Sequence, residues 1–123
     1  MTQKSEFPPI SASHAPWDEF SQGVKFASRS RHLTRAAMGD RPYHVGVVIE
    51  ELAPGKQSCP YHFHMLEEEH LLMLEGECTL RLGEERLRFK AGDYVCFPAG
   101  VKVGHCLVNE TERVCKYVVV GEN

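Results

Sequence analysis

The sequence lacks the features that would place the protein in a membrane, outside the cell or on nucleic acid. No apolar run approaches the ~20 residues that a membrane-spanning helix needs, and the chain starts without the apolar segment of a secretory signal. The 14 basic and 17 acidic residues give a net charge of -3, so no basic excess is available to displace the counterions of a nucleic acid. We therefore expect neither membrane nor nucleic-acid partners.

Cysteine usage argues against a disulfide framework. The five cysteines are an odd number and include no CxxC pair, which favours reduced thiols and a cytoplasmic location. Cys78 and Cys96 lie within apolar alternations, where a free thiol behaves as a small hydrophobic side chain. The sequence predicts that both are buried in the core.

The chain is long enough for one domain, and its texture changes near residue 44. Residues 1–43 show no long periodic pattern but carry several aromatic side chains, so we expect an N-terminal arm that packs on the rest of the chain or on a partner subunit. Residues 44–123 show short β-like runs between turn residues, without helical periodicity, which is typical of an all-β barrel or sandwich. The expected strands are residues 45–52, 59–64, 69–74, 78–82, 87–89, 94–97, 105–108 and 114–120.

The residues most suited to chemistry are His62, His64, Glu69 and His105. Two histidines at i and i+2 on a strand project from the same face, so both imidazoles can reach one ion. Such a pair alone is found about as often on a surface as at a metal. Glu69, after a short turn, and His105 would complete a set of three nitrogens and one oxygen. This set suits a divalent transition metal and leaves up to two positions open.

Spacing selects Glu69 among three consecutive glutamates. Only Glu69 is in phase with Leu71 and Met73 of the strand that follows, so Glu67 and Glu68 are expected in solvent. His70 points to the opposite face and is expected to be structural or exposed. The same alternation predicts that the thiols near the ligands, Cys59 and Cys106, point away from the ion, which disfavours a thiol-based mechanism.

The first part of this pattern resembles the first motif of the cupin superfamily. That motif is a glycine, then His-x-His, a glutamate and a closing glycine. The sequence matches it with one additional residue before His62, and Glu69 leaves the usual spacing to the closing glycine. The matching residues are Gly55, His62, His64, Glu69 and Gly76.

The second cupin motif is also present. It consists of a glycine, Pro-x-Gly, a histidine and an asparagine, and the spacer before His105 is two residues longer than usual here. The matching residues are Gly92, Pro98, Gly100, His105 and Asn109. The resemblance covers residues 45–120 and implies a small cupin of type 2. Its expected fold is a double-stranded β-helix, or jelly-roll-like barrel, with one metal inside the open end and an irregular N-terminal arm.

The resemblance implies two classes of function. The first is a metal-dependent enzyme of dioxygenase or isomerase type that acts on a small oxygen-rich metabolite, with iron, manganese, nickel or zinc as the metal. The second is a non-catalytic module that binds or senses a sugar or a carboxylate. Tyr61 and Tyr94 are expected to pack in the core or at the rim rather than to act in catalysis. A homodimer is expected, because barrels of this family commonly pair.

Overall fold

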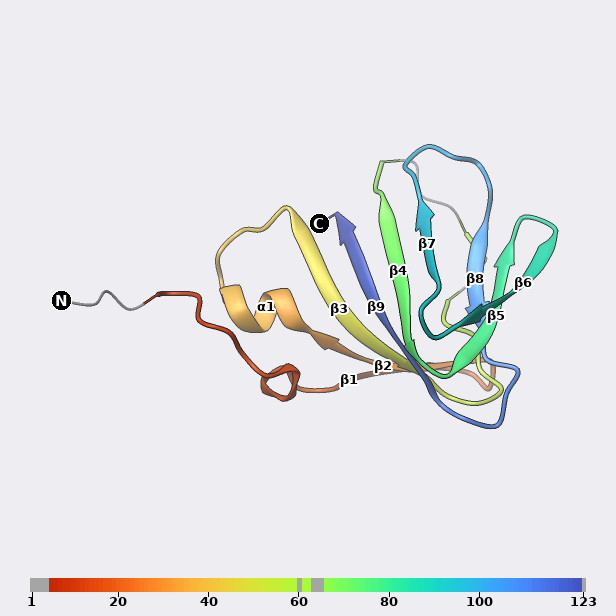
Figure 1. The fold of residues 1–123 in the computed structure, drawn as a ribbon, viewed down its shortest axis with the longest axis horizontal. Coiled ribbons are helices and arrows are strands. Elements are labelled where there is room, and N and C mark those ends of the chain that lie inside the picture. The colour runs from red at the N-terminus through yellow and green to blue at the C-terminus, as the bar shows by residue number, and fades with distance from the viewer. Residues whose placement is uncertain (1–4, 60, 63–65, 123) are drawn as a thin grey trace.

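The computed structural model describes residues 5–59, 61–62 and 66–122, which form two antiparallel sheets (Figure 1). The six-stranded sheet has the order β1-β2-β3-β9-β4-β7, and the three-stranded sheet has the order β6-β5-β8. The helical elements of this part of the chain are a 3-10 turn, Ala12–His14, and one short helix, α1 (Leu33–Met38). The strands are β1 (Asp18–Gln22), β2 (Phe26–His32), β3 (Val45–Leu52), β4 (Glu69–Glu75), β5 (Glu77–Leu82), β6 (Glu85–Lys90), β7 (Tyr94–Phe97), β8 (His105–Val108) and β9 (Cys115–Glu122).

Alternation along the strands builds the core between the two sheets. In β4, Leu71 and Met73 are buried whereas Leu72 and Leu74 are exposed, because successive side chains of a strand face opposite sides of its sheet. The inward side chains of both sheets form a single apolar cluster. Its buried members are Leu52, Leu71, Met73, Cys78, Leu80, Phe89, Phe97, Leu107, Cys115 and Tyr117.

Seven of the predicted strands appear as β3 to β9, with bounds within two residues of those expected. The strand predicted over residues 59–64 was wrong for the part that the structure describes. There Gln57 bridges Val108 and His62 bridges His105. The two bridges are therefore five residues apart in this segment but three residues apart in β8. This unequal spacing amounts to a bulge between the two bridges, which breaks the alternation along this segment. His64 lies outside the described residues.

The N-terminal arm adds two strands that the sequence pattern did not predict. β1 and β2 form a hairpin, and β2 pairs with β3 so that Ser30 lies opposite Glu50. Trp17, just before β1, lies against the guanidinium groups of Arg29 and Arg31, each 4.0 Å from its ring centroid. The hairpin therefore extends the larger sheet beside the barrel (Figure 1).

One cysteine prediction holds and one fails. Cys78 is buried in the core, as predicted, but Cys96 is exposed. The register pairs Cys96 with His70 on the outer face of the sheet, while Val95 packs against the core and Phe97 is buried in it. The run from Tyr94 to Phe97 is apolar at every position, so the sequence carried no phase to show which side chains face inward.

None of the helices among residues 5–59, 61–62 and 66–122 has the length and apolar character needed to cross a membrane.

Candidate metal centre

Three of the four predicted ligands meet at one place between the sheets. Glu69 is the first residue of β4 and His105 is the first residue of β8, while His62 lies in the bulged segment that bridges to β8. Backbone hydrogen bonds hold the two histidines together: the His62 N–H donates to the His105 carbonyl at 3.2 Å, and the His105 N–H donates to the His62 carbonyl at 2.7 Å. The backbone pairing therefore holds the two imidazole-bearing residues directly opposite each other.

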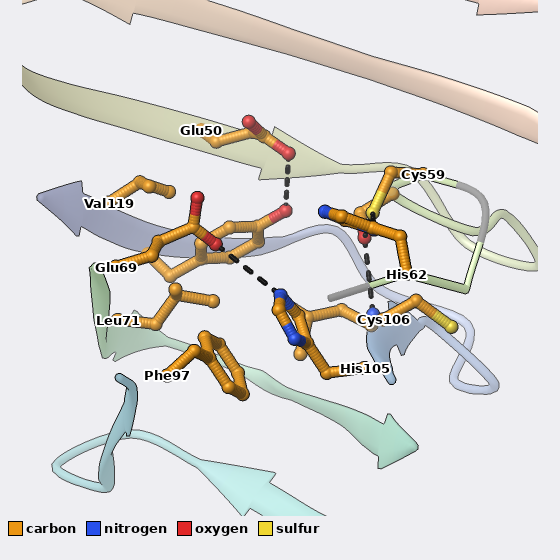
Figure 2. A pocket seen from close by; sticks show the side chains of 12 residues that line it. Glu50, Cys59, His62, Glu69, Leu71, Phe97, His105, Cys106 and Val119 are labelled. Carbon is orange, nitrogen blue, oxygen red and sulfur yellow. Dashed lines mark hydrogen bonds and ion pairs between the residues drawn. The ribbon is translucent and has the colours of Figure 1, made fainter. Parts of the chain in front are cut away.

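The side-chain geometry fits a shared ion. His105 Nε2 lies 3.7 Å from Glu69 Oε1, and the ring centroids of His62 and His105 are 4.8 Å apart (Figure 2). Two donor atoms that each bind one zinc-sized ion at ~2.1 Å lie at most ~4.2 Å apart. The Glu69 and His105 donor atoms satisfy this limit.

Packing fixes the orientation of the His105 ring. Phe97 stacks on it with the ring centroids 3.6 Å apart and the planes 4° from parallel. Phe97 lies opposite Glu69 in the β4–β7 register, so the same strand pair positions the carboxylate and the aromatic wall. His105 is 4% exposed, which keeps competing water away from the ring.

The fourth predicted ligand, His64, falls outside the described residues. Within residues 5–59, 61–62 and 66–122, no group of three or more His, Cys, Asp or Glu side chains is arranged to hold a metal ion. The assignment of His62, His64, Glu69 and His105 as metal ligands therefore stays a prediction.

His62, Glu69 and His105 line a cavity of about 220 Å³. Its wall combines apolar side chains with carboxyl, imidazole, phenol and thiol groups. The lining residues are Glu50, Ser58, Cys59, His62, Glu69, Leu71, Phe97, His105, Cys106, Leu107, Tyr117 and Val119. The sequence did not indicate that Glu50, Cys59 or Tyr117 belongs to this site.

Glu50 is a second carboxylate in the cavity. It lies directly opposite Tyr117 in the β3–β9 register, and its Oε1 is 2.5 Å from the Tyr117 hydroxyl (Figure 2). The Ser30 hydroxyl donates to its other oxygen at 3.4 Å. Burial raises the pKa of Glu50, and burial likewise raises that of Tyr117 well above its ordinary value. The sequence feature that could have indicated Glu50 is an acidic residue in phase with Leu52, which is buried.

Glu50→Gln should make the metal-free protein more stable at alkaline pH. A pKa that is raised in the folded state contributes stability that is complete below the ordinary pKa of glutamate and is lost as pH rises through the raised value. Glutamine stays neutral, so the stability of the variant should match that of the wild type at about pH 4 and exceed it at higher pH. Urea denaturation of both proteins in chelator across this range measures the difference. A difference that does not change with pH would contradict the pKa shift.

Cys59 faces the site, contrary to the prediction. Its Sγ lies 3.5 Å from His62 Nδ1, because the bulge turns this side chain toward the cavity instead of following strand alternation. Burial raises the pKa of the Cys59 thiol to about 11. At neutral pH the group is therefore a thiol rather than a reactive thiolate.

Cys106 differs from Cys59, as the sequence predicted. Its sulfur accepts a hydrogen bond from Gln57 Nε2 at 3.3 Å, and Figure 2 shows it pointing away from Glu69 and His105. The Gln57 amide also donates to the Cys59 carbonyl at 2.8 Å. Gln57 therefore links the bulged segment to β8.

The remaining polar candidates lie outside the cavity. His70 faces outward, with Nδ1 2.6 Å from the Tyr94 hydroxyl and Nε2 2.5 Å from Glu68. Tyr61 is also exposed, and its hydroxyl donates to the Gly83 carbonyl at 3.1 Å. The Tyr61 ring fills the space in which a Cβ at Gly104 would lie, 2.2 Å away. Tyr61 therefore packs at the rim, and Tyr94 belongs to a surface network.

The sequence matches a known protein family. The family model described as a cupin domain matches residues 48–121, which is more than half of the chain. The chain belongs to the cupin family. The two antiparallel sheets are therefore the jelly-roll-like barrel expected from the two motifs.

Solved structures resemble this cupin over most of its length. A sugar phosphate isomerase of the cupin superfamily from Silicibacter pomeroyi DSS-3 matches with a TM-score of 0.83 and 26% identity, covering 94% of this chain and 76% of that one. A protein named as a candidate sugar phosphate isomerase, from Acidithiobacillus ferrooxidans, has a TM-score of 0.72 and 30% identity. That match covers 79% of this chain and 60% of the other, so the cupin spans less than two thirds of that protein.

A protein described as a predicted oxalate decarboxylase from Thermotoga maritima has a TM-score of 0.76 and 22% identity, and the match covers 94% of this chain and 98% of that one. At this identity the likeness concerns the fold alone. No curated protein matches the sequence.

Proposed function

We propose that this cupin holds one divalent transition metal with His62, His64, Glu69 and His105 and acts on a small oxygen-rich metabolite. The observation that carries the proposal is the meeting of Glu69 Oε1 and His105 Nε2 at 3.7 Å beside the His62 ring in one cavity. When bound, such a metal supplies a positive charge for substrate oxygens or, if it is iron, a centre for oxygen chemistry.

Isomerase chemistry is the better supported of the two enzyme types. One of the similar structures is named as a sugar phosphate isomerase and another as a candidate for one. The cavity also contains a carboxylate, Glu50, outside the proposed ligand set. Interconversion of an aldose and a ketose needs a base that takes a proton from the hydroxyl-bearing carbon and returns it to the former carbonyl carbon. The hydroxyl proton moves between the two oxygens, so no oxidant is required.

Glu50 is suited to this transfer. Its raised pKa makes the carboxylate a stronger base than an exposed glutamate. The 2.5 Å contact with Tyr117 and the Ser30 hydrogen bond fix its orientation. We assign Glu50 as the group that carries the proton and Glu69 as a metal ligand, so the two carboxylates have different roles in one cavity.

Elemental analysis of untagged protein purified without chelator tests the metal site. We expect about one equivalent of transition metal per chain in the wild type, because four protein ligands define one ion. The double variant His62→Ala, His64→Ala should lose it. Iron would favour oxygen chemistry, and zinc, nickel or manganese would favour isomerisation. If both proteins stay metal-free after incubation with these ions, the proposed site is wrong.

Turnover separates the enzyme from a binding module. The metal-loaded protein is incubated in D₂O with a panel of aldose and ketose phosphates, and proton NMR follows loss of the signal from the exchanged C–H. Exchange in the wild type that is absent in Glu50→Gln would support the isomerase. Saturable binding of a sugar phosphate without exchange would favour the module that only binds its ligand.

A further inference from the structure

The bulged segment brings a thiol against one particular nitrogen of a proposed ligand. Cys59 Sγ lies 3.5 Å from Nδ1 of His62, and the Ser58 hydroxyl lies 3.5 Å from the same sulfur. This separation is a normal hydrogen-bond length for sulfur. Figure 2 shows the two side chains next to each other at the wall of the cavity, with the His62 ring pointing inward.

An imidazole that binds a metal uses only one of its nitrogens for the ion. The other nitrogen carries a proton, and a partner that accepts this proton fixes both the tautomer and the ring orientation. In most metal sites the acceptor is a carboxylate, a backbone carbonyl or water. The sulfur of a cysteine is a weaker acceptor, but here it occupies the corresponding position.

We propose that Cys59 is a positioning residue for His62: its sulfur accepts the Nδ1–H, which leaves the Nε2 lone pair for the metal. This inference rests on the proposed metal site and specifies how that site is organised. It also gives the bulge a function. Because the bridges at Gln57 and His62 are unequally spaced on the two sides, Cys59 does not follow the alternation of a regular strand, which would turn it away from the ligand.

Two other roles for Cys59 make different predictions. If the sulfur itself bound the metal, a thiolate would be in the ligand set and a sulfur-to-metal charge-transfer band would appear. If Cys59 only filled space, alanine would change stability without changing how the bound metal holds His62. Cys106 also lies next to a proposed ligand in the sequence, but its sulfur accepts a hydrogen bond from Gln57 and points away from Glu69 and His105. Being close to a ligand in the sequence is therefore not sufficient for the proposed role.

Cobalt provides the test because its bound state is visible by absorption and by paramagnetic NMR. Co²⁺ is titrated into the metal-free wild type, Cys59→Ala and Cys59→Ser, with Cys96→Ala as the control that removes an exposed thiol on the outer face. We expect Cys59→Ala to bind Co²⁺ about 10- to 100-fold more weakly, the usual effect of losing the partner of a ligating histidine. Serine should recover most of this loss, and the Cys96 variant should match the wild type.

The ring proton gives a readout that a space-filling role would not alter. In the Co²⁺ protein, the N–H of each ligating imidazole gives a shifted, exchangeable resonance. The resonance of the His62 Nδ1–H should be observable in the wild type and lost to fast solvent exchange in Cys59→Ala. Equal affinity and unchanged N–H resonances in Cys59→Ala would overturn the inference, as would a thiolate charge-transfer band in the wild type. Failure of the wild type to bind Co²⁺ would instead refute the proposed metal site.

Discussion

Glu69→Gln should weaken metal binding by more than about 100-fold, which exceeds the 10- to 100-fold effect of losing an outer partner of a ligand. The amide has nearly the same size and shape as the carboxylate, so the variant removes the negative charge while keeping the packing at the start of β4. Glu69 Oε1 faces His105 Nε2 at 3.7 Å, and the carboxylate supplies the only charge in the proposed ligand set. Isothermal titration with Mn²⁺ or Zn²⁺ measures the loss.

The adjacent glutamates are matched controls for this change. Glu67 and Glu68 are exposed, and Glu68 contacts His70 rather than the cavity. Glu67→Gln and Glu68→Gln make the same chemical change one or two residues away and should leave the affinity unaltered. A comparable loss in either control, or none in Glu69→Gln, would mean that the carboxylate ligand has been assigned to the wrong residue.

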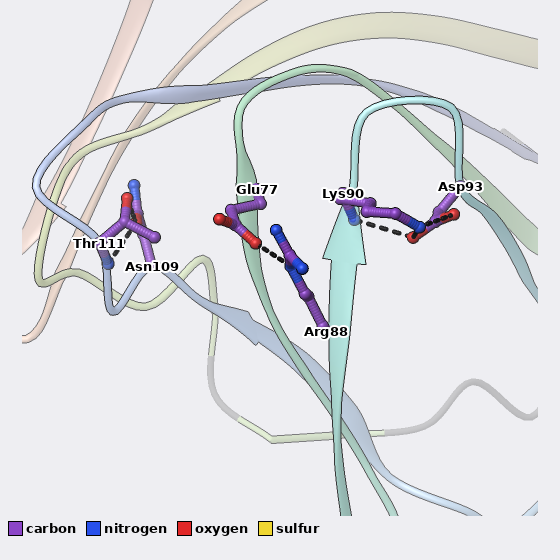
Figure 3. A network of polar contacts seen from close by, with 6 residues as sticks. All are labelled: Glu77, Arg88, Lys90, Asp93, Asn109 and Thr111. Carbon is purple, nitrogen blue, oxygen red and sulfur yellow. Dashed lines mark hydrogen bonds and ion pairs between the residues drawn. The ribbon is translucent and has the colours of Figure 1, made fainter.

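Asn109→Ala should reduce the free energy of unfolding by about 2–4 kcal/mol, because it removes the four hydrogen bonds of a buried side chain, among them the donor to the buried Leu52 carbonyl. Asn109 is completely buried. Its amide donates to the carbonyl of Leu52 at 2.9 Å and to that of Arg113 at 2.7 Å, and its oxygen accepts from the backbone N–H and the hydroxyl of Thr111. Figure 3 shows the contact with Thr111 in the loop that leads to β9.

Urea denaturation of the metal-free protein measures this effect, and metal titration separates it from a role in the site. Because Asn109 joins the loop after β8 to the end of β3, its loss should destabilise the barrel without altering the affinity of the molecules that remain folded. Asn109→Asp keeps the acceptor oxygen and loses both donors, so it should also destabilise. Normal stability combined with lost metal binding would place Asn109 in the metal site instead.

The all-β fold could be predicted because its evidence is local. Turn residues at short intervals and alternation within each run locate β3 to β9 to within two residues, and the phase of Leu71 and Met73 identifies Glu69 as inward-facing. The same method failed where alternation gave no information. The run containing Cys96 is apolar throughout, and the segment containing Cys59 is bulged, so the predicted orientation of each thiol was wrong.

By itself, the sequence determined the strand positions, the inward phase of Glu69 and the spacing of the two cupin motifs, because each depends on residues that are neighbours along the chain. Tertiary structure alone decided that Glu50 meets Tyr117 and that Cys59 meets His62. The first contact requires the register between β3 and β9, and the second requires a bulge opposite β8. Register and bulges are set by pairing between segments far apart in the chain, whose free energy is a property of both strands together.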